Sequence, residues 1–191
     1  MPQLFRVFSC RAAAKPGEPG GALYVPPQGG GRIDNPAVYS VLYLSDSPAG
    51  AIAESFGRFP EWTVSMLEGS PGLPGSRRAL ARYRLDDTGK AAPVCNLDDP
   101  KQLLALRLRP SDVVSREYGR TRAWALRIYD QKAWAGVRWW SYYEPSWSSF
   151  GLWNVRSLGL EQVSSLSLDD PALLEASRVI VRRVIAARTN Q

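Results

Sequence analysis

The sequence predicts an α+β fold in one layered domain, in which strands pair mostly antiparallel and helices flank the sheet. Segments rich in β-branched and aromatic residues occur between segments of helical periodicity, and clusters of glycine and proline separate them. Their order lacks the regular strand and helix alternation that is typical of a parallel nucleotide-binding sheet. Of the 191 residues 45% are hydrophobic, so we expect a single domain over residues 1–191 with one substantial core.

Two strands and one helix are predicted in the first third of the chain. LFRVFSC (residues 4–10) is rich in β-formers, and the many glycine and proline residues after it predict a long loop. AVYSVLYLS (37–45) ends in a continuous apolar run, which is typical of a strand covered on both faces. Ser47 can cap a helix that begins at Pro48 and runs through AGAIAESF, with Glu54 in its second half.

The rest of the chain predicts three more helices and four more strands. Helices are expected where aspartate and proline precede a helical pattern, after Asp98 or Asp99 and after Asp170, and also in YGRTRAWALRIYDQKA. The last helix is expected to extend over about 171–188. Its apolar stripe has three- and four-residue spacing and consists of Leu173, Ala176, Ile180, Val184 and Ala187. Strands are predicted at RRALARYRL (77–85), APVCNL (92–97), GVRWW (136–140) and SSFGLWNV (148–155), of which the last two are expected to pair.

The composition excludes several kinds of site. The chain has no histidine and only two cysteines, Cys10 and Cys95, so the common zinc sites and histidine-based triads are excluded, and no metal site is expected. We interpret both cysteines as small hydrophobic residues in a reducing compartment. The formal net charge of +6 favours anionic ligands such as nucleotides, phosphate, nucleic acid or an acidic partner, without selecting among them. Apolar runs too short for a bilayer and the lack of a secretory signal predict a soluble, cytoplasmic protein.

The segment GGGR, which ends at Arg32, is a candidate anion site. Consecutive glycines allow backbone amides to approach an anion, and the adjacent guanidinium can bind phosphate through two hydrogen bonds. The segment lacks the lysine and the serine or threonine of a P-loop, and a predicted strand follows it instead of a helix. Taken alone, it is better explained as a flexible loop with a solvated arginine.

The order of several motifs resembles the RES family, which is named for a spaced arginine, glutamate and serine. An arginine in the first strand (FRVF), a second in a glycine-rich loop (GGRIDNP) and the segment VLYLSDSPAGAIAE follow the family's order. TRAWALRIYDQKAWAGVRWWSYYEPSWSSFGLWN is similar to the family's later helix, its strand before the serine and its closing strand. The resemblance covers residues 4–154. It departs from the family after Arg32, where IDNP replaces a more usual aromatic residue and asparagine, and in residues 60–90, which show no matching pattern.

The resemblance implies a fold similar to that of ADP-ribosyltransferases and diphtheria-type toxins. It also implies an activity that degrades NAD, in some members by phosphorolysis. NAD is then the expected substrate and inorganic phosphate the expected co-substrate, with no prosthetic group. Many members resemble the toxins of bacterial toxin–antitoxin pairs, so the implied protein partner is an Xre-type antitoxin that plugs the NAD cleft.

Five residues that match the family pattern are the candidate site residues. Cleavage between nicotinamide and ribose develops positive charge on the sugar, which the carboxylate of Glu54 can stabilise. Arg32 and Arg6 can neutralise the pyrophosphate or position phosphate. Tyr43 can stack on nicotinamide or hydrogen-bond the ribose, and the Ser141 hydroxyl can hold an amide, a ribose or the glutamate. Their structural alternatives are a solvated glutamate, an arginine on the outer face of the sheet, a core tyrosine and a turn serine.

Three other functions are compatible with the sequence. The same cleft can transfer ADP-ribose to a protein or to water, as an ADP-ribosyltransferase or an NAD glycohydrolase. A basic nucleic-acid-binding module is disfavoured, because the basic residues are dispersed and no binding motif is present. A catalytically silent protein of the same fold that binds a partner is the third alternative.

Overall fold

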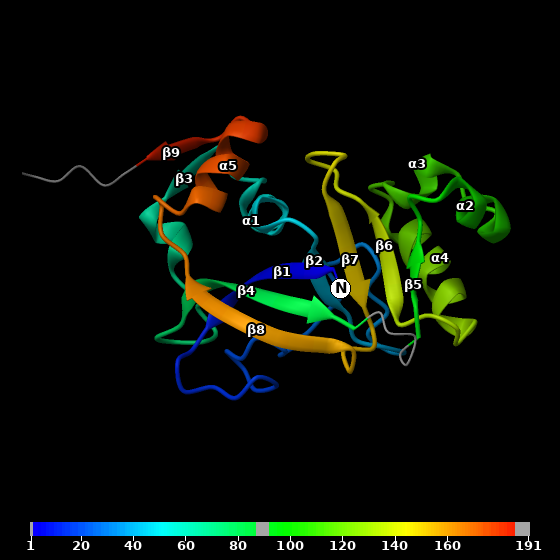
Figure 1. The fold of residues 1–191 in the computed structure, drawn as a ribbon, viewed down its shortest axis with the longest axis horizontal. Coiled ribbons are helices and arrows are strands. Elements are labelled where there is room, and N and C mark those ends of the chain that lie inside the picture. The colour runs from blue at the N-terminus through cyan, green and yellow to red at the C-terminus, as the bar shows by residue number, and fades with distance from the viewer. Residues whose placement is uncertain (1, 87–91, 186–191) are drawn as a thin grey trace, which may run out of the picture.

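The computed structural model describes residues 2–86 and 92–185 and contains a seven-stranded sheet with helices grouped near its two ends (Figure 1). The strand order is β5-β6-β7-β2-β1-β4-β8. Only β5 and β6 are parallel to each other, and every other neighbouring pair of this sheet is antiparallel. The predicted fold class, α+β with mostly antiparallel strands and flanking helices, is therefore confirmed.

The elements of the structure have the following bounds. The strands of the large sheet are β1 (Gln3–Cys10), β2 (Leu42–Ser45), β4 (Arg77–Leu85), β5 (Val94–Asn96), β6 (Gly136–Trp140), β7 (Ser148–Leu152) and β8 (Leu158–Ser165). A second, two-stranded sheet consists of β3 (Glu61–Thr63) and β9 (Arg183–Ile185), with a short 3-10 helix at Val64–Leu67 after β3. The helices are α1 (Pro48–Phe56), α2 (Pro100–Leu106), α3 (Pro110–Val113), α4 (Tyr118–Asp130) and α5 (Pro171–Val179).

Three helices begin with the capping chemistry that the sequence predicts. The side chains of Ser47, Asp99 and Asp170 accept hydrogen bonds from backbone N–H groups in the first turns of α1, α2 and α5. A proline follows each cap, at a position where the helix needs no backbone N–H donor. The start of α1 is therefore fixed by local sequence, and this start sets where Glu54 falls along the helix.

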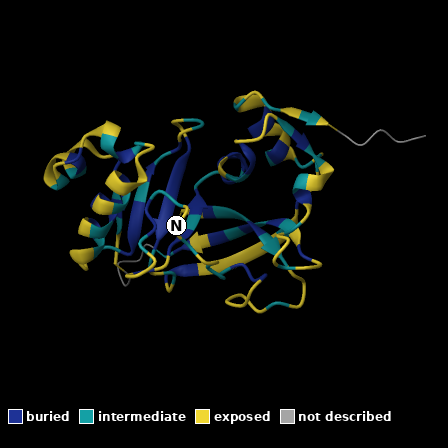
Figure 2. Cartoon of the chain, turned by 180° about the vertical axis from the view of Figure 1, so that it is seen from behind, coloured by how far each residue is buried: buried dark blue, intermediate teal, exposed yellow. Residues whose placement is uncertain are grey.

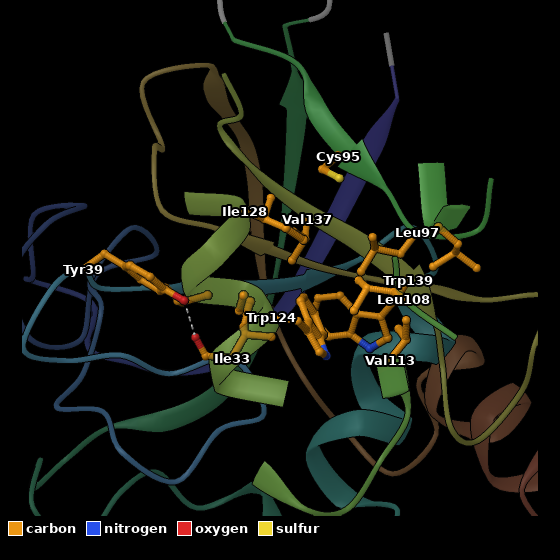
Figure 3. Packing of buried hydrophobic residues seen from close by; sticks show 13 residues of the cluster. Ile33, Tyr39, Cys95, Leu97, Leu108, Val113, Trp124, Ile128, Val137 and Trp139 are labelled. Atoms are coloured by element: carbon orange, nitrogen blue, oxygen red, sulfur yellow. Dashed lines mark hydrogen bonds between the residues drawn. The ribbon is translucent and has the colours of Figure 1, made fainter. Parts of the chain in front are cut away.

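The largest hydrophobic cluster lies between β6 and the group of helices α2, α3 and α4 (Figure 3). Val137 and Trp139 of β6 belong to this cluster together with Trp124 of α4. Tyr39 joins it from the loop before β2, and its hydroxyl donates a hydrogen bond to the carbonyl of Ile33 at 2.8 Å (Figure 3). The glycine-rich loop and the strand after it are thereby held against the core.

A separate hydrophobic cluster packs α1 against α5. Ile52 and Phe56 of α1 are buried with Leu173 and Ala176 of α5. Glu54 is exposed, lies outside this cluster and follows Gly50 by one turn of α1. Figure 2 shows that the strands in the middle of the sheet are buried, whereas β8 at its edge is exposed along most of its length.

The C-terminal region departs from the prediction. The apolar spacing predicts a helix over about 171–188, but α5 ends at Val179 and residues 183–185 form β9, which pairs in parallel with β3. Val181 has a φ of 53°, a left-handed conformation that ends the helical path of the chain. The guanidinium of Arg182 donates to the carbonyl of Gly57, at the end of α1. Ala187 and the last residues of the predicted helix lie outside the described residues.

Two further differences concern strands. The strand predicted at 37–45 begins only at Leu42, because residues 35–39 form a turn in which the Tyr39 N–H donates to the Asn35 carbonyl at 2.9 Å. The predicted pairing of GVRWW with SSFGLWNV is confirmed, since β6 and β7 form an antiparallel pair. Strands β3 and β8 are not predicted from the sequence. Among the described residues, none of the helices has both the length and the apolar character that a membrane span requires.

Candidate active site

A cavity of about 520 Å³ opens beside α1 on one face of the sheet. Its walls come from β1, β2, the glycine-rich loop, α1, the segment between α3 and α4, and the ends of β6 and β7. A volume of this size is typical of sites for small molecules and cofactors. Four of the five predicted site residues line it, namely Arg6, Arg32, Tyr43 and Glu54. The fifth, Ser141, lies behind the wall and contacts Glu54.

Two buried serine hydroxyls hold one oxygen of the Glu54 carboxylate. The Oγ of Ser141 donates to Glu54 Oε1 at 2.6 Å, and the Oγ of Ser149 donates to the same oxygen at 3.3 Å. Ser141 is itself oriented, because its Oγ accepts a hydrogen bond from the Tyr143 N–H at 3.2 Å. Within residues 2–86 and 92–185 the second carboxylate oxygen, Oε2, has no hydrogen-bond partner. The carboxylate is therefore fixed at one oxygen and able to act on a ligand through the other.

Strand register and a close helix contact bring these groups together. Ser149 lies on the interior strand β7, opposite Trp139 of β6 and Ser45 of β2. A Cβ atom at Gly50 of α1 would lie 2.5 Å from the Oγ of Ser45, so only glycine allows the helix to approach the sheet this closely. Because Glu54 is one turn further along α1, this approach places its carboxylate near the two serines.

Arg32 is anchored at one nitrogen and open at the others. Its Nη1 donates to the carbonyls of Val113 at 3.1 Å and Ser115 at 2.6 Å, at the end of α3. Among the described residues its Nε and Nη2 atoms have no hydrogen-bond partner. A guanidinium that is held by carbonyls and lines a cavity can bind two oxygens of a phosphate without first ordering its own side chain.

Arg6 also lines the cavity, but its guanidinium is bonded elsewhere. Nη1 donates to the carbonyl of Ala22 at 3.0 Å, and the hydroxyl of Tyr83 donates to the same carbonyl. The guanidinium carbon lies 5.8 Å from the ring centre of Phe8. Burial is the main cause that lowers the pKa of Arg6, which the nearby Tyr83 partly offsets. These contacts fasten the loop after β1 to the sheet.

The hydroxyl of Tyr43 is fully used within the protein. It donates to Asp34 Oδ1 at 2.6 Å and accepts from the Ile33 N–H at 3.2 Å. Burial first, and then the hydrogen bond to Asp34, raise the pKa of Tyr43 well above its usual value. What Tyr43 can offer a ligand is therefore its ring, since the hydroxyl has its donor and one acceptor position occupied.

The amides of the glycine run bind a carboxylate of the chain itself. Asp34, which is only 3% exposed, accepts from the N–H groups of Gly29 at 2.8 Å and Gly31 at 2.6 Å through its Oδ2. On the other side of the loop, Arg122 donates to the carbonyls of Gly29 and Gly31. The loop is a hydrogen-bonded structure, so the anion-binding capacity of GGGR resides in Arg32 and not in these two amides.

Asp34 and Ser149 are the residues of the site that the sequence does not predict as functional. Asp34 stands in the IDNP segment, and its position two residues after a candidate arginine is the signal that could have indicated it. Ser149 gives no such signal, because its distance from Glu54 depends on how β7 pairs with β2 and β6. In the described part of the chain no group of three or more cysteine, aspartate or glutamate side chains is placed to hold a metal ion.

The structure is an α+β domain with a cavity of the size that small-molecule sites have, and a fixed carboxylate and an anchored guanidinium both line it. The model of the RES domain family matches residues 3–170, and the chain therefore belongs to the RES domain family. This match confirms the resemblance and extends it beyond residue 154.

One solved structure has a similar fold. It is the crystal structure of the M. tuberculosis MbcT–MbcA toxin–antitoxin complex, of which one chain matches with a TM-score of 0.59 and 16% sequence identity. The match covers 94% of the present chain and 88% of that chain. At this identity the likeness concerns the fold. A search of curated proteins found no match.

Proposed function

We propose that this protein cleaves NAD between nicotinamide and ribose, with inorganic phosphate as the acceptor, and that it acts as the toxin of a toxin–antitoxin pair. One geometric observation carries the proposal. The Glu54 carboxylate is held at Oε1 by Ser141 and Ser149 and lines the same cavity as Arg32. Membership of the RES domain family and the fold shared with a chain of a toxin–antitoxin complex support it.

The carboxylate supplies the electrostatic part of the reaction. As the bond from the anomeric carbon to the nicotinamide nitrogen breaks, both electrons go to nitrogen, so neutral nicotinamide leaves and positive charge develops on the ribose. Glu54 stabilises this charge. Because two serines already hold its Oε1, the carboxylate needs little reorganisation when the charge appears. An oxygen of phosphate then forms the new bond to the anomeric carbon.

The other lining residues position the substrate. Arg32 binds the pyrophosphate through the guanidinium nitrogens that the α3 carbonyls leave unused. The ring of Tyr43 packs against the nicotinamide or the ribose, while Asp34 fixes the hydroxyl of that ring. Arg6 contributes positive potential to the cavity wall from its place beside Ala22.

Product analysis with and without phosphate tests the reaction. We expect purified protein to release nicotinamide and to form ADP-ribose that carries a phosphate, detected by mass spectrometry, only when phosphate is present. Nicotinamide release at an equal rate without phosphate indicates an NAD glycohydrolase, and a mass increase on an added protein indicates an ADP-ribosyltransferase. NAD that stays intact for hours, together with salt-dependent retention by DNA, supports a nucleic-acid-binding module instead.

A cellular experiment tests the biological role. A toxin that consumes NAD acts in the cytoplasm, where its substrate is, and an antitoxin of the Xre type that covers the cavity would restrain it. Induction of the wild-type chain in bacteria should lower cellular NAD and stop growth, whereas Glu54→Gln at equal abundance should do neither. Growth arrest by both chains would separate toxicity from NAD cleavage.

A further inference from the structure

Two exposed tyrosines stand at the mouth of the cavity. Tyr118 at the start of α4 is 40% exposed, and Tyr142 in the turn after β6 is 59% exposed, yet both line the cavity. Other lining residues, among them Ser45 and Trp139, are almost inaccessible to solvent. We call the exposed part of the lining, with Tyr118 and Tyr142, the mouth of the cavity. The rings of these two tyrosines are partly exposed and can therefore contact a ligand.

Tyr142 is held in place by the side chain behind it. The turn between β6 and β7 lies between α1 and α3 (Figure 1). In this turn Ser141 donates a hydrogen bond to Glu54, and Tyr142 accepts one from Arg116. The guanidinium carbon of Arg116 lies 4.9 Å from the ring centre of Tyr142, and Nη2 of Arg116 donates to the Tyr142 hydroxyl. Arg116 does not line the cavity, whereas Tyr142 does. Arg116 thus fixes the hydroxyl of Tyr142, and the ring of Tyr143 meets the Tyr142 ring edge-on with 5.5 Å between ring centres. The Tyr142 ring is held by two neighbours and still lines the cavity.

Tyr118 stands beside the anchored arginine. The guanidinium carbon of Arg32 lies 5.9 Å from its ring centre, and that of Arg122 lies 5.7 Å away. An exposed ring is thus adjacent to the group that can bind phosphate. An aromatic surface next to a phosphate-binding cation is the arrangement that proteins use to hold a nucleotide, because the base stacks while the cation binds the backbone charge.

We propose that Tyr118 and Tyr142 form a stacking site for the adenine base, so that the cavity selects a dinucleotide over a mononucleotide. The inference rests on the proposed function, which puts the nicotinamide ribose at Glu54 and the pyrophosphate at Arg32. The adenosine half then extends beyond Arg32 toward the mouth. Every base has a face that can stack, so this site needs no polar side chain to hydrogen-bond the edge of the base. The site therefore recognises the adenosine half by its stacking surface and by the adjacent charge.

Binding of AMP tests the stacking site without any catalysis. We expect calorimetry to show AMP binding to the wild type. In Tyr118→Ala/Tyr142→Ala the affinity should be at least about 25-fold lower, since each of the two lost stacking contacts weakens binding by roughly fivefold or more. Tyr118→Phe/Tyr142→Phe keeps both rings and should bind within about threefold of wild type. Phe59→Ala is a matched control. Phe59 is likewise an exposed ring beside an arginine, with 4.6 Å between the Arg58 guanidinium carbon and the ring centre, but it does not line the cavity.

Kinetics on two substrates test selection. Wild type should have a lower KM for NAD than for nicotinamide mononucleotide, which lacks the adenosine half. The double alanine variant should raise the KM for NAD at least about 25-fold and leave its kcat and the KM for the mononucleotide unchanged. An unchanged KM for NAD, or an equal rise for both substrates, overturns the proposal. If the wild type cleaves neither substrate, the proposed function fails. The stacking site is then judged by AMP binding alone. It stands if AMP binding still depends on the two rings, and it is overturned if loss of the rings leaves AMP binding unchanged.

Discussion

Replacing Ser141 by alanine should slow NAD cleavage more than replacing Ser149. Both hydroxyls donate to Oε1 of Glu54, but the distances are 2.6 Å for Ser141 and 3.3 Å for Ser149. The first distance is typical of a strong hydrogen bond to a charged oxygen, and the second lies beyond the usual range for a hydroxyl donor. Ser141 therefore carries most of the positioning of the carboxylate.

The magnitude follows from the energy of such a bond. A hydrogen bond to a charged group contributes about 1.5–3 kcal/mol, and each 1.4 kcal/mol lost in the transition state is about tenfold in rate. Ser141→Ala should thus lower kcat by about 10- to 100-fold, and Ser149→Ala by about threefold. Since both serines bind one oxygen, each can partly replace the other, so the double variant should lose more than the product of the two single effects.

The assay is nicotinamide release from NAD at saturating substrate, with thermal unfolding as the control for structure. That control is needed because Ser141 also accepts the Tyr143 N–H, so its loss should lower the free energy of unfolding by about 1 kcal/mol. An unchanged kcat in Ser141→Ala, or a larger loss in Ser149→Ala than in Ser141→Ala, would refute the assignment of the positioning role.

Three other predictions concern the loop and the core around the site. Gly31→Ala should lower the free energy of unfolding in urea by about 1–3 kcal/mol, because the alanine Cβ would collide with the Tyr43 hydroxyl and lie 2.6 Å from Asp34 Oδ1. A urea midpoint equal to that of wild type would argue against this packing. Asp34→Ala should raise the KM for NAD. Asp34→Asn should largely restore the wild-type KM, since the amide oxygen can still accept hydrogen bonds. Equal KM values in both variants would remove Asp34 from a positioning role. Burial raises the pKa of Tyr83 to about 12, from a usual value near 10. Between these two pH values the unfolded chain loses the Tyr83 proton while the folded chain keeps it. The free energy of unfolding therefore falls as pH rises through this range. Tyr83→Phe should flatten that fall in urea unfolding at pH 9 and 11.5, and a slope equal to wild type would contradict the assignment.

Local patterns predict much of the fold, because they act within a few residues. RRALARYRL is rich in alternating apolar and arginine residues in its second half and forms β4 over the predicted residues. Ser47 followed by Pro48 starts α1 where expected. The C-terminal prediction is wrong because Val184 has the spacing of a helix but pairs with Trp62, about 120 residues away in sequence, in a strand. Edge strand β8 has polar and exposed residues, so it carries no apolar alternation that would identify it.

The site is predictable only where residue type and order carry the chemistry. Arg32 and Glu54 stand out because a guanidinium after glycines and a carboxylate after a capped helix start match a family pattern, and the structure places both on one cavity. Ser149 reaches Glu54 only because of the register of β7, and the Tyr43 hydroxyl is occupied because it donates to Asp34. Neither the strand register nor this hydrogen bond can be predicted from a single sequence. Sequence also cannot indicate that the guanidinium of Arg6 binds the Ala22 carbonyl.

The most direct test of the proposed chemistry is the rate of nicotinamide release from NAD by wild type, Glu54→Gln and Glu175→Gln. Glutamine at 54 keeps the size of the side chain and an oxygen for Ser141 but removes the charge that faces the ribose. Glu175 lies exposed on α5 away from the cavity lining and serves as the matched control. We expect a rate at least about a hundredfold lower for Glu54→Gln and a wild-type rate for Glu175→Gln. Equal rates for wild type and Glu54→Gln would contradict the account.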